Sequence, residues 1–444
     1  MTLRKKIFLF YLVLIPFSIP SFLEGILPLN TYLVSIAIFP FFLAFLAYFV
    51  HSIKNSVPLN KFWLHSFFVV VFLGFYSSIM GAIHYTDYGT MFGEDSISAT
   101  ISFFMYPIFA WLIIWVNYNG FIDIGLERIK RVLLFWSISF ILISLLQLVV
   151  LNVPSFAKVY DGFNFLGFFR DSNYILKEGR ICGYLKEPSI VGNFTVCLLL
   201  PYSFYESFYC RKKKYFILFL MILLVSILSF SSATYVALIV FFIFIVAYFV
   251  KKNRKDAKTL LTSIFIAISV FGILISFNYS DFQRLLFKIT DLSNMSTAYR
   301  YSIIYNDLMI FKDNPFGIGN GNQGFFYNNV AQYFYNQSQS PEILYAINGG
   351  YGLIGGGPFF GSLISGYGIV GIVAFIVIYG KMLTIGKKIK YTFPKYLFFS
   401  SIMIFSVMGI VSVNINLDFV FPFIIGLLAF ENNYQQEDKM NAIM

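Results

Sequence analysis

The feature that most constrains this chain is a succession of long apolar runs separated by short polar gaps. A helix of about 20 residues rises about 30 Å, which is the thickness of the hydrocarbon layer of a bilayer. We therefore predict an all-α polytopic membrane protein with about twelve transmembrane helices. The predicted spans lie near 7–23, 31–50, 62–83, 97–116, 132–151, 189–206, 215–231, 234–250, 260–278, 358–380, 396–413 and 419–430.

Basic residues are divided unequally between the gaps. Of the 32 Lys and Arg residues, 23 lie in one alternate set of gaps and the remaining nine in the other. Basic residues in short loops stay on the cytoplasmic side during membrane insertion. This asymmetry places both termini in the cytoplasm and two long loops, 152–187 and 279–357, on the outer side.

The apolar stretch from 215 to 250 could form one overlong helix or two short ones. Basic residues flank it at Arg211–Lys214 and again at 251–252. A single helix would put these two groups on opposite sides of the membrane, so charge favours two helices with a turn near Ser231 to Thr234. We assume a similar turn at Asn414 to Asp418.

Composition leaves room for one membrane domain, residues 1–444, and no separate soluble domain. The chain is 58% hydrophobic and 12% charged. Its net charge of +11 is spread over short loops beside spans, where topology and anionic headgroups account for it, so no nucleic-acid partner is expected. The basic N-terminus and first apolar run lack a small-x-small cleavage site, which indicates an uncleaved first span.

Cysteine and histidine predict neither a disulfide nor a metal site. Cys182 is placed outside, Cys197 within a span and Cys210 inside, so no pair can meet. The three histidines are equally scattered, and only His84 is placed outside. We expect no metal and no cofactor.

The predicted spans contain no Asp, Glu, Lys or Arg in their interiors. Ion-coupled transporters usually carry such residues in the membrane, so a transporter or flippase is disfavoured but remains an alternative. Three carboxylates, Glu187, Glu206 and Asp418, are placed at span ends, where we expect water or headgroups to reach them. Any chemistry should therefore lie at the outer surface.

The first outer loop ends in a cationic segment that runs directly into a span. Pro188 suits the first turn of a helix, so Glu187 should lie at its outer mouth. The free N–H groups of a helix N-terminus attract anions, and Arg180 and Lys186 add formal charge. Alternatively, both cations contact only lipid phosphates, and Glu187 forms a salt bridge or a helix cap.

The second outer loop is too long to be a passive connector. Residues 296–314 predict an amphipathic helix that lies on the membrane with its apolar face in the headgroup boundary. Its apolar residues recur at helical spacing: they are Ile303, Ile304, Leu308 and Phe311. Arg300 and Asp307 are seven residues apart and should share one side of this helix.

A glycine-rich segment follows this helix. Gly319, Gly321 and Gly324 match the dinucleotide pattern G-x-G-x-x-G, but no βαβ unit surrounds them, so we reject that interpretation. Gly317, Gly319 and Gly321 are better explained by a tight backbone path with N–H groups near a ligand. The later glycines of span 358–380 predict close helix packing.

Four segments together resemble the O-antigen polymerase family called Wzy and, more distantly, the O-antigen ligases. In chain order they are Arg180-Ile-x-Gly-x-x-x-Glu187-Pro188-Ser189, Ser229-Phe-Ser-Ser-Ala, Arg300 followed by Asn314-Pro-Phe-Gly317-Ile-Gly319, and Gly366-Tyr-Gly368-Ile-Val-Gly371. Their order and the two large outer loops match that family over nearly the whole chain.

The resemblance implies a GT-C-like membrane glycosyltransferase in the bacterial cytoplasmic (inner) membrane, with its active site on the periplasmic face. Its donor and acceptor would be undecaprenyl-diphosphate-linked oligosaccharides, and a chain-length regulator is a candidate partner. The enzyme would transfer the growing O-antigen or capsule glycan to the non-reducing end of the next repeat. Arg180 and Arg300 match the outward arginines of the family and, with Lys186, would hold the diphosphate.

Two departures from the family pattern matter. Ligases generally carry a His before the glycine-rich span, whereas Gly356-Gly357-Pro358-Phe359 contains none, and Ser232 stands where the family often has Arg. The missing His favours polymerase over ligase and leaves the acceptor-activating base open. Our candidates for the base are Glu187, then Asp307 and Asp313, with His84 as a remote one.

Overall fold

The computed structural model describes residues 1–17, 37–55, 61–88, 96–164, 167–185, 188–252, 291–348, 358–411 and 420–431. All regular elements in these ranges are helices. In chain order they are α1 (Leu3–Leu14), α3 (Ile38–Lys54), α4 (Lys61–Tyr88), α5 (Ser96–Ile124), α6 (Leu126–Asn152), η1 (Pro154–Phe156), α7 (Ala157–Phe163), α8 (Ser172–Glu178), α9 (Pro188–Val191), η2 (Gly192–Leu199), α10 (Leu200–Phe204), η3 (Tyr205–Tyr209), α11 (Lys213–Leu228), α12 (Ser232–Lys252), α15 (Met295–Asp313), α16 (Gln323–Phe326), α17 (Asn328–Ser338), α18 (Pro341–Ile347), α19 (Phe359–Lys388), α20 (Thr392–Val411), α21 (Val420–Gly426) and η5 (Leu427–Glu431).

Eleven of the twelve predicted spans overlap these helices, and the run 260–278 lies outside the described residues. Four helices are long and apolar enough to cross a membrane, and shorter apolar helices accompany them. These four are Phe62–His84, Leu126–Asn152, Phe359–Lys388 and Thr392–Ile410. The architecture is that of a polytopic membrane protein, and the number twelve stays a prediction.

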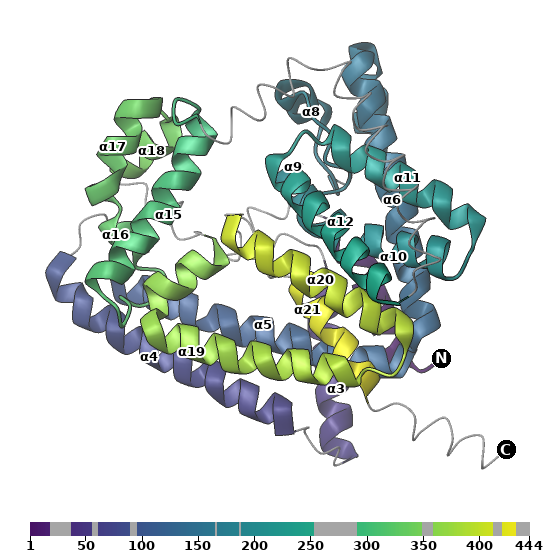
Figure 1. Ribbon diagram of the computed structural model, residues 1–444, viewed down its shortest axis with the longest axis horizontal. Helices are drawn as coiled ribbons and strands as arrows, with labels where there is room; N and C mark the ends of the chain where they lie inside the picture. Colours follow the sequence, from purple (N-terminus) through teal and green to yellow (C-terminus); the bar gives the residue numbers. More distant parts are fainter. Residues whose placement is uncertain are drawn as a thin grey trace.

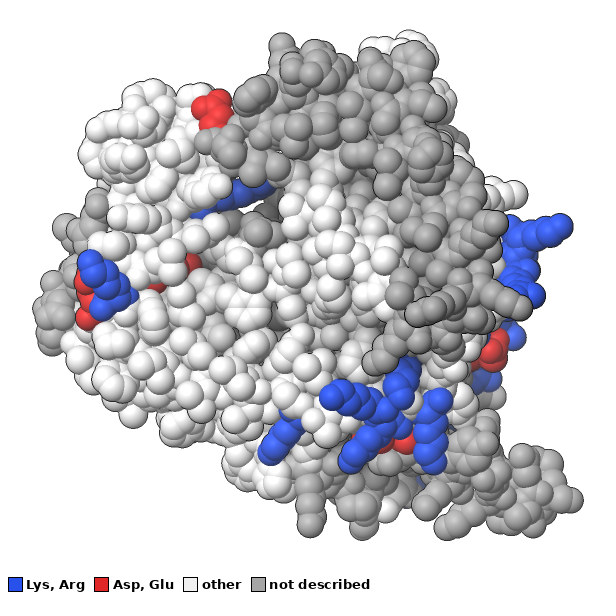
Figure 2. Space-filling model, in the orientation of Figure 1, with Lys and Arg blue, Asp and Glu red and all other residues white. Residues whose placement is uncertain are grey.

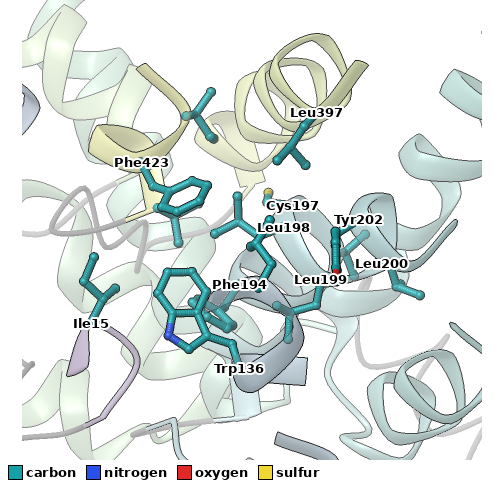
Figure 3. Packing of buried hydrophobic residues seen from close by; sticks show 14 of the residues in the cluster. Ile15, Trp136, Phe194, Cys197, Leu198, Leu199, Leu200, Tyr202, Leu397 and Phe423 are labelled. Atoms are coloured by element: carbon teal, nitrogen blue, oxygen red, sulfur yellow. The ribbon is translucent and has the colours of Figure 1, made fainter. Parts of the chain in front are cut away.

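The helices form a bundle with a smaller helical group at one end. In Figure 1, α4 and α5 run side by side with α19, α20 lies along α12, and α15–α18 gather at the end remote from the N-terminus. Aromatic rings and leucine side chains pack together in the centre of the bundle (Figure 3). Trp136 of α6 lies 5.4 Å from the rings of both Phe194 and Phe423, which ties three segments distant in the chain to one core.

The predicted turn between 215–231 and 234–250 is confirmed. Helices α11 and α12 are separated by Ser229–Ser231, where Phe230 has a φ of 46°. The Ser229 hydroxyl donates to the Ser226 carbonyl at 2.8 Å, so it satisfies one of the free carbonyls at the end of α11. The second predicted turn, at Asn414 to Asp418, lies outside the described residues.

Ion pairs connect segments that we placed on the cytoplasmic side. Arg4 contacts Asp123 at 2.6 Å, and Glu206 lies between Lys130 (2.9 Å) and Lys212 (2.5 Å). We call this part, built from these five residues, the inner end. Figure 2 shows basic residues gathered at the lower centre and right edge of the visible face, near the N-terminus of Figure 1.

The expected exposure of Glu206 is wrong. Its side chain is 1% exposed, because the start of α6 and the start of α11 close over it. A buried carboxylate is tolerated only with compensating charge, and Lys130 and Lys212 supply it.

The amphipathic helix at 296–314 exists as α15, but it does not lie alone on a membrane surface. It packs against α17 and α18 on one side and against α19 on another. Ile303 is buried in a cluster with Val330 and Phe334, whereas Leu308 is exposed. The buried side of α15 is therefore set by helix packing rather than by a lipid surface.

Candidate outer-face site

The segment after Arg180 is folded into the bundle instead of remaining a surface loop. Ile181, Cys182 and Tyr184 are buried, and the Tyr184 hydroxyl donates to the Trp136 carbonyl of α6 at 3.0 Å. The side-chain amide of Gln147 holds the backbone here. Its Oε1 accepts from the N–H groups of Cys182 (2.9 Å) and Gly183 (2.8 Å), and its Nε2 donates to the Gly183 carbonyl at 2.7 Å.

Gly183, the glycine of the first family segment, is required by this packing. Its φ of 61° lies in the left-handed region. A Cβ at this position would lie 2.4 Å from the ring of Phe140 on α6. The segment can therefore approach α6 only without a side chain here.

Arg180 directly follows Gly179, which caps α8 with a φ of 64°. The guanidinium is half-buried at the edge of the folded segment. Lys186 and Glu187, the other two predicted site residues of this loop, lie outside the described residues. Pro188 begins α9, as predicted, and the helix continues through η2, α10 and η3.

The second family segment packs directly on the helix that follows the first. A Cβ on Gly192 would lie 2.6 Å from the Thr234 backbone of α12. The Thr195 hydroxyl lies 3.0 Å from the Ser226 hydroxyl of α11. Both η2 and η3 are π-helical, and such widened turns are frequent at functional sites.

Arg300 joins this arrangement from the second outer loop. The guanidinium Nη1 of Arg300 donates to the hydroxyl of Ser232 at 3.4 Å, so the second and third family segments meet at this point. Helix α15, which carries Arg300, is capped by Asn294, whose side chain accepts from the Thr297 N–H at 3.3 Å. The arginine is half-buried. Figure 2 shows basic atoms at the edge of a hollow between the region of α15–α18 and the centre of the molecule.

Asp307 lies on the same side of α15, facing α19. Its carboxylate accepts from the Ser365 hydroxyl at 2.7 Å, and a Cβ on Gly361 would lie 2.4 Å from its other oxygen. The side chain is 1% exposed, and burial raises the pKa of this carboxyl to about 7. Asp307 is thus held as a mainly neutral acid below neutral pH, not as an open carboxylate.

Two further candidate bases lie within the described residues. Asp313 is exposed at the last turn of α15. His84 is half-buried near the end of α4, with its ring 6.2 Å from that of Phe326. Asp307, Asp313 and His84 thus have different surroundings, and Glu187 lies outside the described residues.

The Asn314–Gly319 loop is bound to a break in α19. The N–H groups of Ile318 and Gly319 donate to the carbonyls of Ser365 and Gly366, both at 3.0 Å, and Ile369 N–H donates to the Pro315 carbonyl at 2.9 Å. The break occurs at Gly368, whose φ is 58°. A Cβ there would lie 2.3 Å from the backbone of Phe316.

These contacts correct part of the expectations for the two glycine groups; close helix packing does hold at Gly361, where a Cβ would meet Asp307 of α15. Gly317, Gly319 and Gly321 do adopt left-handed φ values of 83°, 85° and 97°. Their N–H groups, however, donate within the chain rather than toward a ligand, for Gly321 to the Gln323 side chain at 2.8 Å. Gly366 and Gly368 of α19 admit this loop and do not serve helix–helix packing.

The same loop also contacts α4. The Asn320 N–H donates to the Ser77 hydroxyl at 2.7 Å, and the Tyr76 hydroxyl donates to the Phe316 carbonyl at 2.5 Å. The topology predicted from charge would place the end of α4 and the start of α19 on the outer side, together with loop 279–357. We call α15–α18 with these two helix ends the outer end.

Within the described ranges, no cluster of three His, Cys, Asp or Glu residues is arranged to hold a metal. Cys182 and Cys197 are both buried, and neither forms a disulfide. The outer end instead offers a guanidinium, hydroxyls and amides. That donor set suits an anionic or polyhydroxylated ligand.

Three polar residues that organise this end were missed in the sequence. They are Gln147, Ser77 and Ser365, all within predicted spans. A buried amide or hydroxyl in an apolar run needs a hydrogen-bond partner. An isolated Gln or Ser within a predicted span is therefore the sequence signal that would have identified these three residues.

Residues 216–348 match the family model described as O-Antigen ligase. The match begins in α11 and ends after α18, so it contains the hairpin, Arg300 and the Asn314–Gly319 loop, but not Arg180 or α19. No curated protein and no solved structure matches the chain. The matched region and its helical membrane architecture support placing this chain in the O-antigen ligase/polymerase superfamily.

Proposed function

We propose that this protein is a membrane glycosyltransferase that polymerises undecaprenyl-diphosphate-linked oligosaccharides on the outer face of the bacterial inner membrane. The growing glycan passes from its lipid diphosphate to the non-reducing end of the next lipid-linked repeat. Support comes from the family match over 216–348 and from the convergence of family segments at the outer end.

The observation that carries the proposal is the position of Arg300. Its guanidinium reaches from a periplasmic-loop helix to Ser232, beside the helix that begins at Pro188. A lipid diphosphate anchored in the membrane would present its phosphates at this depth. A guanidinium supplies charge and two parallel hydrogen bonds to a phosphate, and Arg180 is the second cation proposed for this task.

The reaction forms one bond and breaks another. An acceptor hydroxyl oxygen attacks the anomeric carbon, and the bond from that carbon to the diphosphate oxygen breaks. The electron pair leaves with the diphosphate, where arginine stabilises the developing charge. The hydroxyl proton passes to a base, for which Glu187 remains the first candidate. The buried side chain of Asp307 cannot reach an acceptor, whereas Asp313 is exposed and is the alternative base.

The test replaces Arg300 in reconstituted vesicles that contain lipid-linked repeat units. We expect Arg300→Ala to reduce polymer formation by about 100-fold or more, because it removes a preorganised donor from a charged transition state. Arg300→Lys should recover little, because an ammonium cannot form the paired bonds. The matched control is Arg170→Ala, an outer cation that stacks on Tyr174 at 4.5 Å. Full polymerisation by both Arg300 variants would refute the role of this residue.

The second candidate is a ligase, because the matched model carries that description. The two reactions differ in their acceptor. Gel analysis of surface polysaccharide after gene deletion separates them: caps of a single repeat indicate that a polymerase was lost, whereas free polymer on its lipid with a bare core indicates a ligase. Absence of any repeat would instead point to a flippase.

A further inference from the structure

We propose that an exposed tyrosine face on α15 and α17 binds the sugar rings of the substrate. This face consists of Tyr301 and Tyr305 of α15 and Tyr333 of α17, which are 43%, 50% and 59% exposed. The inference rests on the proposed function and adds a glycan subsite that is separate from the cations at the diphosphate.

The rings are held from beneath while their outer faces remain open. Phe334, which is 6% exposed, lies 6.1 Å from the ring of Tyr305 and 5.1 Å from that of Tyr333, centroid to centroid. Phe334 itself packs with Ile303 in the core between α15 and α17. Because this core fixes the two helices, the tyrosines form a prearranged surface that costs little side-chain entropy to use.

The charge of this surface selects the kind of ligand. No charged residue occurs between Asn314 and Pro341. A surface for anionic headgroups would carry Lys or Arg, because each such residue near the membrane adds attraction. Tyr333, Gln332 and Asn336 lie in this uncharged segment, whereas Tyr301 and Tyr305 lie on α15, which also carries Arg300. The uncharged part of the face, on α17, favours an uncharged ligand such as a sugar.

Amides beside the rings add directional hydrogen bonds. Gln332 and Asn336 are exposed on α17, and the Gln332 amide donates to the Asn336 carbonyl oxygen at 2.9 Å. An amide offers both donors and an acceptor, which match the paired hydroxyls of a sugar. Tyrosine rings provide flat faces with negative quadrupole, against which the C–H groups of a sugar ring can lie. Rings and amides together fit a polyhydroxylated chain.

The position of the face suits the glycan part of a lipid-linked substrate. Tyr301 follows Arg300 directly in α15, on a more exposed side of the helix. Figure 1 shows α15 and α17 together at the end of the molecule remote from the N-terminus. A diphosphate held at Arg300 would therefore leave its sugars near the tyrosines.

The test measures binding without transfer. The full-length protein in lipid nanodiscs is titrated with the soluble repeat-unit oligosaccharide released from the surface polysaccharide of the source organism. Affinity is followed by ligand-observed NMR. We expect Tyr305→Ala and Tyr333→Ala each to weaken binding by about 2- to 12-fold, and Tyr305→Phe to retain most of it.

The matched control is Leu308→Ala, because Leu308 is 52% exposed on the same helix but carries no ring. It should bind the oligosaccharide like the parent. Tyr305→Leu serves as a second variant, since it keeps an apolar contact with Phe334 and still removes the ring. Equal losses in Leu308→Ala and Tyr305→Ala, or unchanged binding in both tyrosine-to-alanine variants, would overturn the proposal.

The two proposals fail separately. Tyrosine-dependent oligosaccharide binding in a protein whose Arg300→Ala variant still polymerises would support the sugar-binding face and refute the transfer role of Arg300. Tyrosine-independent binding with transfer lost in Arg300→Ala would refute only the sugar-binding face.

Discussion

Glu206 at the inner end and Asp307 at the outer end are both 1% exposed, yet the groups that surround the two carboxyls differ in charge. Glu206 lies within 3 Å of two lysine ammonium groups, from Lys130 and Lys212. Asp307 is bonded to the neutral hydroxyl of Ser365, and burial raises its pKa to about 7.

The difference shows how each end of the bundle is stabilised. At the inner end, Lys130 near the start of α6 and Lys212 just before α11 neutralise the Glu206 carboxylate of η3. These ion pairs therefore join α6, η3 and the start of α11. At the outer end, neutral hydrogen bonds join α15 to α19, and the guanidinium of Arg300 donates to a hydroxyl rather than serving as the counter-ion of Asp307. The two ends thus differ in what holds a buried carboxyl: ammonium groups at the inner end and a hydroxyl at the outer end.

The largest effect should come from replacing Asp307. Its pKa rises from 3.8 to about 7 on folding, about 3 units at 1.36 kcal/mol each, so ionisation destabilises the fold by at most about 4 kcal/mol. The folded state binds the Asp307 proton more tightly than the unfolded state does. The stability that comes from this protonated carboxyl is therefore fully present below pH 4 and is lost as pH rises through 7. Asp307→Asn should remove that loss.

Thermal unfolding of the parent and of Asp307→Asn in detergent, at pH 5 and at pH 8, measures this pH-dependent loss of stability. We expect the parent to lose stability between these values relative to Asp307→Asn. The control is Asp313→Asn, whose side chain is exposed at the end of the same helix. An identical pH response in the parent and in Asp307→Asn would show that Asp307 is ionised in the fold.

A smaller effect is expected at the inner end. Glu206→Gln keeps the shape of the side chain but leaves the Lys130 ammonium, 18% exposed, without its carboxylate. Removing one member of a buried pair costs about 3 kcal/mol, and the partial exposure of Lys212 reduces this to about 2. Glu127→Gln is the control, because that carboxylate is 78% exposed and 3.7 Å from Lys130. The loss should appear at pH 8 as well as pH 6; equal stability of both variants would contradict the ion-pair role.

The sequence predicted most helices because lipid imposes length and composition on each span. It also predicted the hairpin at Ser231 to Thr234, through the charges that flank it. These features depend on local pattern, which a single chain displays. The roles of Arg300 and Gly317, which come from family resemblance, stay predictions.

The sequence could not predict which distant residues meet. The burial of Glu206 depends on Lys130 from another helix, and the loop on α19 depends on a break at Gly368 that hydropathy does not reveal. Asp307 looked like an accessible acid because its partner, Ser365, lies 58 residues away. Tertiary contacts of this kind need the folded chain.

The smallest effect should come from Ser365→Ala, which refines the account of Asp307. The Ser365 hydroxyl donates to Asp307 at 2.7 Å and accepts from the Gln323 amide at 3.2 Å, so its loss should cost about 1 kcal/mol. That hydrogen bond lowers the pKa of Asp307, against the larger effect of burial. Without it, the pKa should rise further, and the pH at which stability falls should move upward.

Thr384→Ala on the same helix is the control for this last change. Its hydroxyl donates to the Gly380 carbonyl at 2.8 Å on an exposed part of α19, so we expect a change within about 0.5 kcal/mol and no shift of the pH midpoint. A midpoint that stays in place in Ser365→Ala would mean that burial alone sets the pKa of Asp307. The hydroxyl would then join α15 to α19 without tuning the acid, and the contrast between the two equally buried carboxyls would rest on the lysines beside Glu206 alone.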